Sequence, residues 1–232
     1  MQKRKFVWME QYRQRFEAVL AKFARGGEST EPCAPENAEK YNGHLPESIF
    51  YLWDKVGIGV FRDGYFQLCD PDKYRPVLRQ AFGNDPDLDP DKTYPIGFSA
   101  FGEILAWNED HRDVRIALVD SFVSCRWLLA PKQNIDPNIT LLTSLLLADG
   151  ASQDPLDENG SPLFPSVRSR LGILERAQIY GFKPILALGG NRTADSLTVY
   201  DALPHMSILA QATQLKLMDL KQYPPKLVRM IG

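Results

Sequence analysis

Residues 45–71 read LPESIFYLWDKVGIGVFRDGYFQLCDP, and their secondary structure is the easiest in the chain to predict. Pro46 suits the first turn of a helix, because the N–H that proline lacks has no intrahelical partner there. Apolar residues then follow at helical spacing until Gly57. Two short apolar runs flank Asp63-Gly64, the dipeptide favoured by two-residue type I′ hairpin turns. This stretch therefore predicts a helix, a glycine stop and a β-hairpin.

The segments on either side of this stretch continue the pattern. Asp70-Pro71 predicts the start of another helix, since an aspartate N-cap precedes proline at the first helical position. Pro76 lies inside that helix and predicts a kink or a restart before Gly83. Apolar spacing over 12–23 predicts a helix ahead of the stretch. Three downstream segments predict a small antiparallel sheet: 96–98, 103–107 and 114–119.

The second half of the chain alternates apolar segments with polar turns. Four elements are predicted there, in the order helix, helix, strand and helix: 139–148, 163–180, 182–190 and from 202 onward. Residues 122–129 are strongly apolar and are either a strand or a buried connector. The predicted fold class is α+β, with antiparallel sheets and packed helices in two closely associated subdomains, 1–107 and 108–232.

The composition is that of an ordinary globular protein, with 44% hydrophobic residues, 24% charged residues and a net charge of −2. Basic residues gather at both ends and acidic residues in the middle, without a basic stripe interleaved with aromatic residues. We therefore expect no direct binding of nucleic acid. The start of the chain lacks an apolar leader and no apolar run spans a bilayer, so we expect a cytoplasmic protein without membrane contact.

The residues that usually carry chemistry do not form a familiar motif. Three widely spaced cysteines, without a Cys-x-x-Cys pair, predict reduced thiols. Gly189-Gly190 lacks the following lysine and hydroxyl residue of a phosphate-binding loop, so a turn is expected. Histidines occur only at positions 44, 111 and 205, which leaves an enzyme with a composite site as an alternative. We expect no catalytic residue, no cofactor and no metal.

Carboxylates gather in three segments of the middle region. The first has aspartates at alternate positions but carries Pro90 and Ile96 where an EF-hand loop needs glycine and glutamate. An unrelated cation site, a solvated loop and a partner-facing loop all remain open there. The second segment adjoins His111, yet its members are sequential turn residues, which disfavours a metal site. The nine candidates for partner contact are Asp85, Asp87, Asp89, Asp91, Glu109, Asp110, Asp154, Asp157 and Glu158.

Two resemblances follow from these motifs. The order Leu-Pro, a Trp-containing helix, Gly-x-Gly, Asp-Gly and Asp-Pro within 6–105 resembles the GAD-like domain of bacterial immunity proteins, and more distantly the SMI1/KNR4-like superfamily. Farther along, YGFKPILALGG at 180–190, with GSPLF at 160–164 and DALPHM at 201–206, looks like the C-terminal domain of immunity proteins that guard bacteria against DNase effectors of type VI secretion.

This resemblance implies an antitoxin that binds a cognate DNase effector and occludes or distorts its active site. An acidic loop would imitate the charge of DNA in the cationic cleft of a nuclease, and aromatic anchors would hold the complex. A non-catalytic scaffold or regulatory binding protein, as found among relatives in the wider superfamily, is the alternative.

Overall fold

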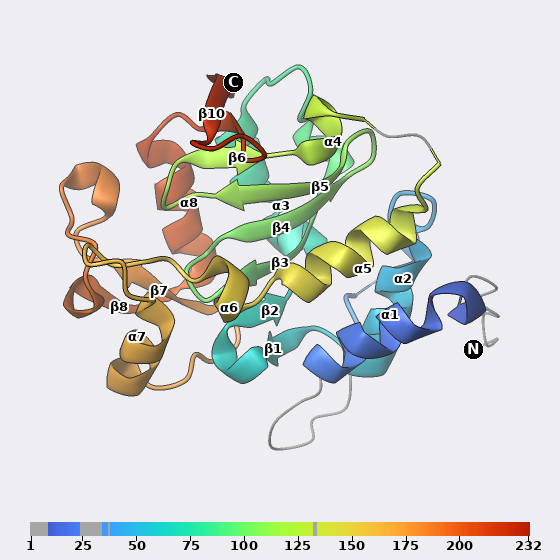
Figure 1. Ribbon diagram of the computed structural model, residues 1–232, viewed down its shortest axis with the longest axis horizontal. Coiled ribbons are helices and arrows are strands. Elements are labelled where there is room, and N and C mark those ends of the chain that lie inside the picture. The colour runs from blue at the N-terminus through green and yellow to red at the C-terminus, as the bar shows by residue number, and fades with distance from the viewer. Residues whose placement is uncertain (1–8, 24–33, 37, 132–133) are drawn as a thin grey trace.

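A mixed sheet of eight strands forms the centre of the computed structural model, which describes residues 9–23, 34–36, 38–131 and 134–232 (Figure 1). In spatial order its strands are β1 (Gly59–Phe61), β2 (Phe66–Leu68), β3 (Thr93–Ser99), β4 (Ile104–Asn108), β5 (Arg112–Ala117), β6 (Phe122–Ser124), β9 (Lys216–Asp219) and β10 (Lys226–Met230). A second sheet pairs β7 (Gln178–Phe182) with β8 (Leu197–Asp201). All pairings are antiparallel except the parallel pair β6–β9.

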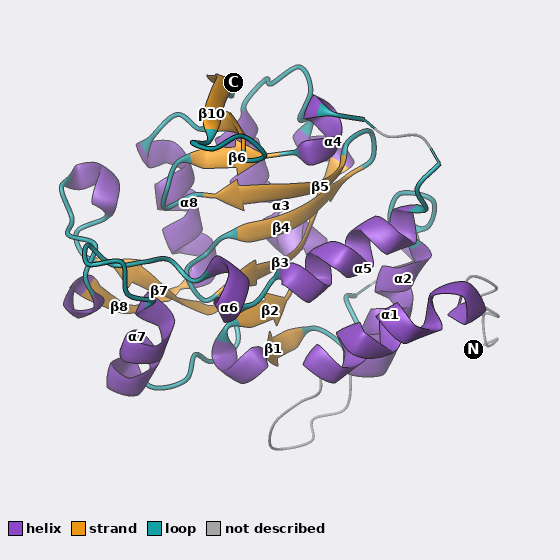
Figure 2. Cartoon of the chain, in the orientation of Figure 1, coloured by secondary structure: helices purple, strands orange, loops and turns teal. Residues whose placement is uncertain are grey.

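Helices cover both faces of the main sheet (Figure 2). On one face, α3 (Pro71–Phe82) packs against β3 and α8 (Ala202–Ala212). On the other face, α5 (Pro137–Leu147) packs against β5, and α1 (Met9–Lys22) and α2 (Glu47–Val56) pack against α5. Three shorter helices are α4 (Arg126–Leu129), α6 (Gly150–Gln153) and α7 (Leu163–Leu171). The fold class is therefore α+β, as predicted.

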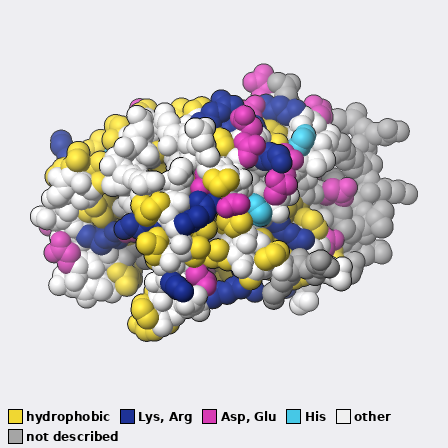
Figure 3. Space-filling model, turned by 90° about the horizontal axis from the view of Figure 1, so that it is seen from above, with side chains coloured by type: hydrophobic (Ala, Val, Ile, Leu, Met, Phe, Trp, Pro, Cys, Tyr) yellow, Lys and Arg dark blue, Asp and Glu magenta, His cyan; other side chains and the backbone are white. Residues whose placement is uncertain are grey.

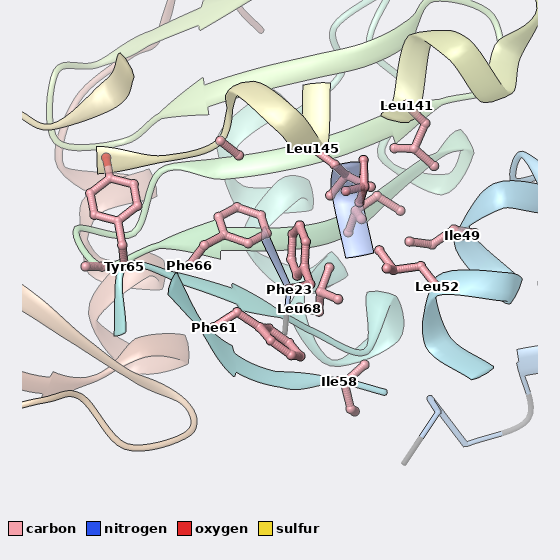
Figure 4. Packing of buried hydrophobic residues seen from close by; sticks show 14 of the residues in the cluster. Phe23, Ile49, Leu52, Ile58, Phe61, Tyr65, Phe66, Leu68, Leu141 and Leu145 are labelled. Carbon is pink, nitrogen blue, oxygen red and sulfur yellow. The ribbon is translucent and has the colours of Figure 1, made fainter. Parts of the chain in front are cut away.

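Two hydrophobic cores result, and β3 contributes to both. Figure 4 shows the first core, where Phe23 and Phe66 lie among aliphatic side chains from α2 and α5. In the β3–β4 ladder Pro95 pairs with Ala106 and Gly97 with Leu105, so Ile96 is an extra residue that forms a bulge. The bulge reverses the alternation of side chains. Tyr94 and Ile96 therefore pack in the first core, whereas Phe98 packs in the second core with α3 and α8.

The predicted helix and hairpin are present as α2 and β1–β2, but the hairpin turn differs from the prediction. Phe61 pairs with Phe66, so the connection has four residues, and Arg62 and Asp63 both have a φ of 56°. The predicted two-residue type I′ turn is wrong. The reason lies outside the hairpin, because the guanidinium of Arg62 donates hydrogen bonds to the backbone carbonyls of Leu145 and Ala148 at the C-terminal end of α5.

Gln67 makes a second connection of the same kind. Its side chain is 2% exposed, and its amide donates to the carbonyl of Gln178 at 2.7 Å while accepting from the N–H of Ala177 at 2.8 Å. Strands β5 and β6 and the β9–β10 pair continue the sheet that β1 to β4 begin. The subdomain boundary between residues 107 and 108 stays a prediction.

Two helices, α3 and α7, differ from their predictions. α3 is continuous from Pro71 to Phe82, so the predicted restart at Pro76 is wrong. Pro76 lies on the exposed side of α3, where water can hydrogen-bond the carbonyl that loses its N–H partner. α7 ends at Gly172, which has a φ of 83°, and not at Gly181, which lies in β7. Glycine in the left-handed region is the usual residue after a helix.

Two further predictions and one omission concern strands. Residues 182–190 are not a strand, because β7 ends at Phe182 and the chain continues through a 3₁₀ turn at Leu186–Leu188. Residues 122–129 divide into the short strand β6 and the short helix α4. The β9–β10 pair was not predicted.

Cys69 and Cys125 are free and buried, and burial raises the pKa of both thiols, whereas Cys33 lies outside the described residues. Over the described ranges, no helix combines the length and the apolar character needed to cross a membrane.

Candidate functional site

The nine predicted carboxylates lie in two places. The segment 85–91 and the turn at Glu109 and Asp110 lie side by side, because β3 and β4 are paired and place their ends together. The N–H of Glu109 donates to the carbonyl of Lys92 at 3.1 Å, and Lys92 Nζ lies 3.0 Å from Asp110 Oδ2. The segment 154–158 lies near β7 and β8, at the opposite end of these strands (Figure 1). The structure therefore brings together six of the nine carboxylates.

Asp85 belongs to the interior of the fold. Its side chain is 0% exposed, and it accepts the backbone N–H of Leu88 at 3.1 Å and of Gly232 at 3.2 Å, as well as that of Asp87. Arg229 Nη2 lies 2.9 Å from its Oδ1. Burial by itself raises the pKa of this carboxyl, but the bonds from Arg229 and the backbone outweigh burial and lower the pKa to about 2. Asp85 therefore anchors the C-terminal residues and does not present its carboxylate to a partner.

The other aspartates of the segment are accessible. Asp89 caps the 3₁₀ turn Pro90–Lys92 by accepting the N–H of Asp91 at 2.8 Å. Asp91 is 68% exposed and lies 2.8 Å from Arg79, whose hydrogen bond lowers the pKa of Asp91. Asp87 accepts from Arg229 at 2.6 Å. An exposed ion pair such as Asp91–Arg79 contributes little to stability, so Asp91 remains able to exchange its partner.

Glu109 connects this segment with the region before α2. Its Oε1 lies 2.8 Å from His44 Nδ1 and accepts the hydroxyl of Tyr94 at 2.7 Å. Burial and, after it, the bond to Glu109 raise the pKa of Tyr94 to about 12. We name the set Asp87, Asp89, Asp91, Glu109 and Asp110, whose members are exposed or half-buried, the acidic surface. Figure 3 shows acidic side chains gathered on one part of this face of the molecule, next to basic and hydrophobic ones.

The carboxylates at 154–158 organise their own loop. Both oxygens of Asp154 lie 3.0 Å from the N–H of Phe164 in the first turn of α7. Burial raises the pKa of Asp154 to about 6. Asp157 closes a turn by accepting two backbone N–H groups at 2.8 Å, and Glu158 accepts the N–H of Arg192 at 3.2 Å. Their bonds to the backbone give these carboxylates a role in shaping the loop.

The side chains that a composite enzyme site requires lie in different surroundings. His44 pairs with Glu109, whereas His205 is 5% exposed and stacks on Tyr200 with ring centroids 4.3 Å apart. Burial lowers the pKa of His205. A mainly apolar cavity of about 120 Å³ lies between the sheet and α5. The Glu103–Arg115 ion pair and Asp113 contribute charged groups to its lining, which includes no histidine. Within the described ranges, no three His, Cys, Asp or Glu side chains are placed to hold a metal ion.

The string YGFKPILALGG is explained by packing. A Cβ on Gly181 would lie 2.4 Å from Nε2 of His205, and a Cβ on Gly190 would lie 2.0 Å from the carbonyl oxygen of Pro184. The Tyr180 hydroxyl donates to the carbonyl of Gly172. Gly189, with a φ of 85°, forms the predicted turn with Gly190. These glycines are required by close contacts within the fold, so the string identifies a structure and not a reaction.

Sequence reasoning missed the β9–β10 hairpin, residues 216–230, which projects at the end of the main sheet (Figure 1). The sequence contains a weak signal for this hairpin. Apolar and charged residues mix in the runs 216–219 and 226–230, and the turn residues Tyr223-Pro224-Pro225 lie between them. The hairpin carries five exposed large apolar side chains, whereas the predicted segments carry one, Leu156.

Comparisons with known proteins agree with this architecture. The model of the GAD-like domain matches residues 14–120, and the model of the T6SS immunity protein Tdi1, C-terminal, matches residues 146–213. No curated protein matches the chain. A crystal structure of Atu4351 from Agrobacterium tumefaciens superimposes with a TM-score of 0.86 and 35% sequence identity, over 94% of this chain and 98% of that one. The chain therefore belongs to the family that joins a GAD-like domain to the C-terminal domain of the type VI secretion immunity protein Tdi1.

Proposed function

We propose that this protein is an immunity protein that binds and neutralises a type VI secretion effector in the cytoplasm, and that the effector is a DNase. The observation that carries the proposal is the presence of both family domains in order within one chain. The agreement in fold and sequence with Atu4351 over nearly the whole of both chains supports it. The protein carries out no reaction of its own and acts by occupying its target.

The acidic surface provides the electrostatic part of this binding. A nuclease presents cationic surface to the phosphates of DNA, and exposed carboxylates attract that surface without offering a bond to cleave. Asp91 and Asp110 are 68% and 55% exposed, and their present partners Arg79 and Lys92 are exposed basic side chains. Arginine and lysine of a nuclease can replace such partners at little cost. Asp85 supports the segment from beneath.

The test is protection of cells and of DNA. The chain is expressed in bacteria together with candidate DNase effectors of type VI systems, and each effector is also incubated with plasmid DNA in the presence of the purified chain. We expect rescue of growth, retention of intact plasmid and a stable complex with one effector. An effector inactivated in its active site is the control for toxicity unrelated to DNA cleavage. Absence of both rescue and plasmid protection for every effector offered contradicts the proposal.

A further inference from the structure

The β9–β10 hairpin concentrates exposed apolar surface. Ten large hydrophobic residues of the described chain are exposed, and half of them lie between residues 220 and 230. They are Leu220, Tyr223, Leu227, Val228 and Met230. Tyr223, at the tip, is 99% exposed. Exposed apolar residues gathered in one short segment mark an interaction site more often than isolated exposed residues do.

The base of the hairpin is fixed while its tip is free. Leu217 and Ile231 are buried, and the N–H of Ile231 donates to the carbonyl of Leu215 at 2.9 Å. Arg229 joins β10 to Asp85 and Asp87. A rigid base lowers the entropy that the hairpin loses when it binds a partner. The hairpin is therefore preorganised for contact.

The charge around the apolar residues is positive. Lys216, Lys221 and Lys226 are exposed, and no ion pair of Lys216 or Lys226 occurs among the residues that the structure describes. The carboxylate of Asp219 is turned to its own loop, where it accepts the N–H of Lys221 at 3.0 Å and the amide of Gln222 at 2.8 Å. A complementary surface is thus apolar with carboxylates at its rim.

A second copy of the chain does not meet this requirement. β10 is the last strand of the sheet, and antiparallel pairing of two such edges would place basic strands against each other. The register of β9 and β10 shifts between Leu227 and Arg229, and Lys226 lies on the strand. Bulges and lysines on an edge strand discourage edge-to-edge pairing. The side chains of the hairpin, and not its backbone edge, are therefore available for docking.

We propose that the β9–β10 hairpin is the docking element for the effector and inserts Tyr223 into an apolar groove of the nuclease that is rimmed by carboxylates. This inference rests on the proposed function. A metal-dependent nuclease combines both required charges, since carboxylates bind its catalytic metal ions within a cationic surface for DNA. The lysines of the hairpin face those carboxylates, and the neighbouring acidic surface faces the cationic rim. Tyrosine is among the residues that most often anchor protein interfaces.

The experiment measures binding of hairpin variants to the effector that the wild-type chain neutralises, purified in a catalytically inactive form. Tyr223→Ala is expected to weaken the Kd by about 30-fold, the size expected for an anchoring aromatic residue. Lys221→Glu combined with Lys226→Glu is expected to slow association by about 10-fold at low salt, with a smaller difference at high salt. Leu188→Ala is the matched control, because Leu188 is 73% exposed and lies in the loop between β7 and β8.

A photo-crosslinking residue at position 223, with position 188 as control, tests contact directly. We expect a crosslink to the effector from position 223 alone, and unchanged thermal unfolding of all variants because the altered side chains are exposed. If the wild-type chain binds the effector and Tyr223→Ala binds with the same Kd, the docking assignment is overturned while the immunity function stands. A crosslink between two copies of the chain also overturns it. If the wild-type chain neutralises no effector, both proposals fall.

Discussion

The segment 85–91 and the β9–β10 hairpin lie next to each other, are joined by Arg229, and differ in how their side chains are engaged. The segment is rich in charge, yet one of its four aspartates is buried and the other three bond to neighbouring groups of the chain. The hairpin is poor in acidic residues, and five of its large apolar side chains are exposed. Charge that is conspicuous in a sequence can thus serve the fold, while the surface free to bind lies in a segment without a conspicuous motif.

The largest effect on stability is expected at Asp85, where the segment 85–91 contacts the hairpin. Asp85→Ala removes a buried carboxylate, leaves three backbone N–H groups without their acceptor, and leaves Asp87 as the carboxylate partner of Arg229. We expect a loss of about 3 kcal/mol in the free energy of unfolding, measured by chemical denaturation. Asp91→Ala is the matched control and is expected to change stability by less than about 0.5 kcal/mol, because its ion pair is exposed. Equal losses of stability in the two variants would contradict the distinction between the buried anchor Asp85 and the exposed Asp91.

The stability of the protein at low pH should depend on Asp85 in the same way. The pKa of Asp85 is lowered to about 2, below its ordinary value, so the stability that Asp85 contributes is present above the unfolded pKa near 4. That stability is lost as the pH falls from about 4 through 2. Asp85→Asn is expected to remove this part of the pH dependence. Thermal unfolding of both proteins between pH 2 and pH 6 checks it, and parallel curves would contradict the assignment.

Measurements of binding should distinguish the accessible Asp89 and Asp91 from the buried anchor Asp85. Asp89→Asn combined with Asp91→Asn retains the cap of the 3₁₀ turn and removes two negative charges. We expect association with the effector to slow by about 3- to 10-fold at low salt and to become less sensitive to salt. Stopped-flow rates that stay unchanged at low salt would remove the segment from the interface. Glu158→Gln, at the other acidic segment, is the control.

The smallest effect is expected at Asp154, where the sign is reversed. Burial raises the pKa of Asp154 to about 6, so the folded state holds this proton more tightly than the unfolded state. Stability should therefore decline modestly as the pH rises from about 4 through 6. Asp154→Asn is expected to flatten this decline, as measured by thermal unfolding at constant salt. A stability that rises over this range in the wild type, and not in the variant, would contradict the assignment.

Local patterns predicted much of this fold because several elements are determined by nearby residues. Pro46, Gly57 and the Asp70-Pro71 pair mark the limits of α2 and α3 correctly. The turn after β1 was not predictable locally, because its geometry depends on Arg62 reaching carbonyls more than 80 residues away. The face reversal at Ile96 depends likewise on pairing with β4. Long-range contacts of this kind leave no periodic trace in sequence.

The candidate site was predictable as a set of carboxylates but not as an arrangement. Aspartates at alternate positions predict a charged segment. The burial of Asp85, however, depends on Arg229, which lies 144 residues farther along the chain. Glu109 and Asp110 could not be joined to that segment before β3 and β4 were paired. The hairpin escaped prediction because its strands are short, β9 buries only Leu217, and β10 lacks the alternation of buried and exposed residues.

The two connections between the family domains have a consequence for how such proteins can vary. Arg62 and Gln67 belong to the GAD-like part, and they bind main-chain atoms of Leu145, Ala148, Ala177 and Gln178. Every residue type carries a main-chain carbonyl, and every type except proline carries the N–H that Ala177 donates, so these connections tolerate most replacements of the side chains on the receiving partner. A chimaera that exchanges residues 146–213 for those of a relative can therefore keep the hydrogen bonds from Arg62 and Gln67 while its exposed side chains differ. Because the two connections use main-chain atoms on the receiving side, specificity for a partner can change while the connections are kept.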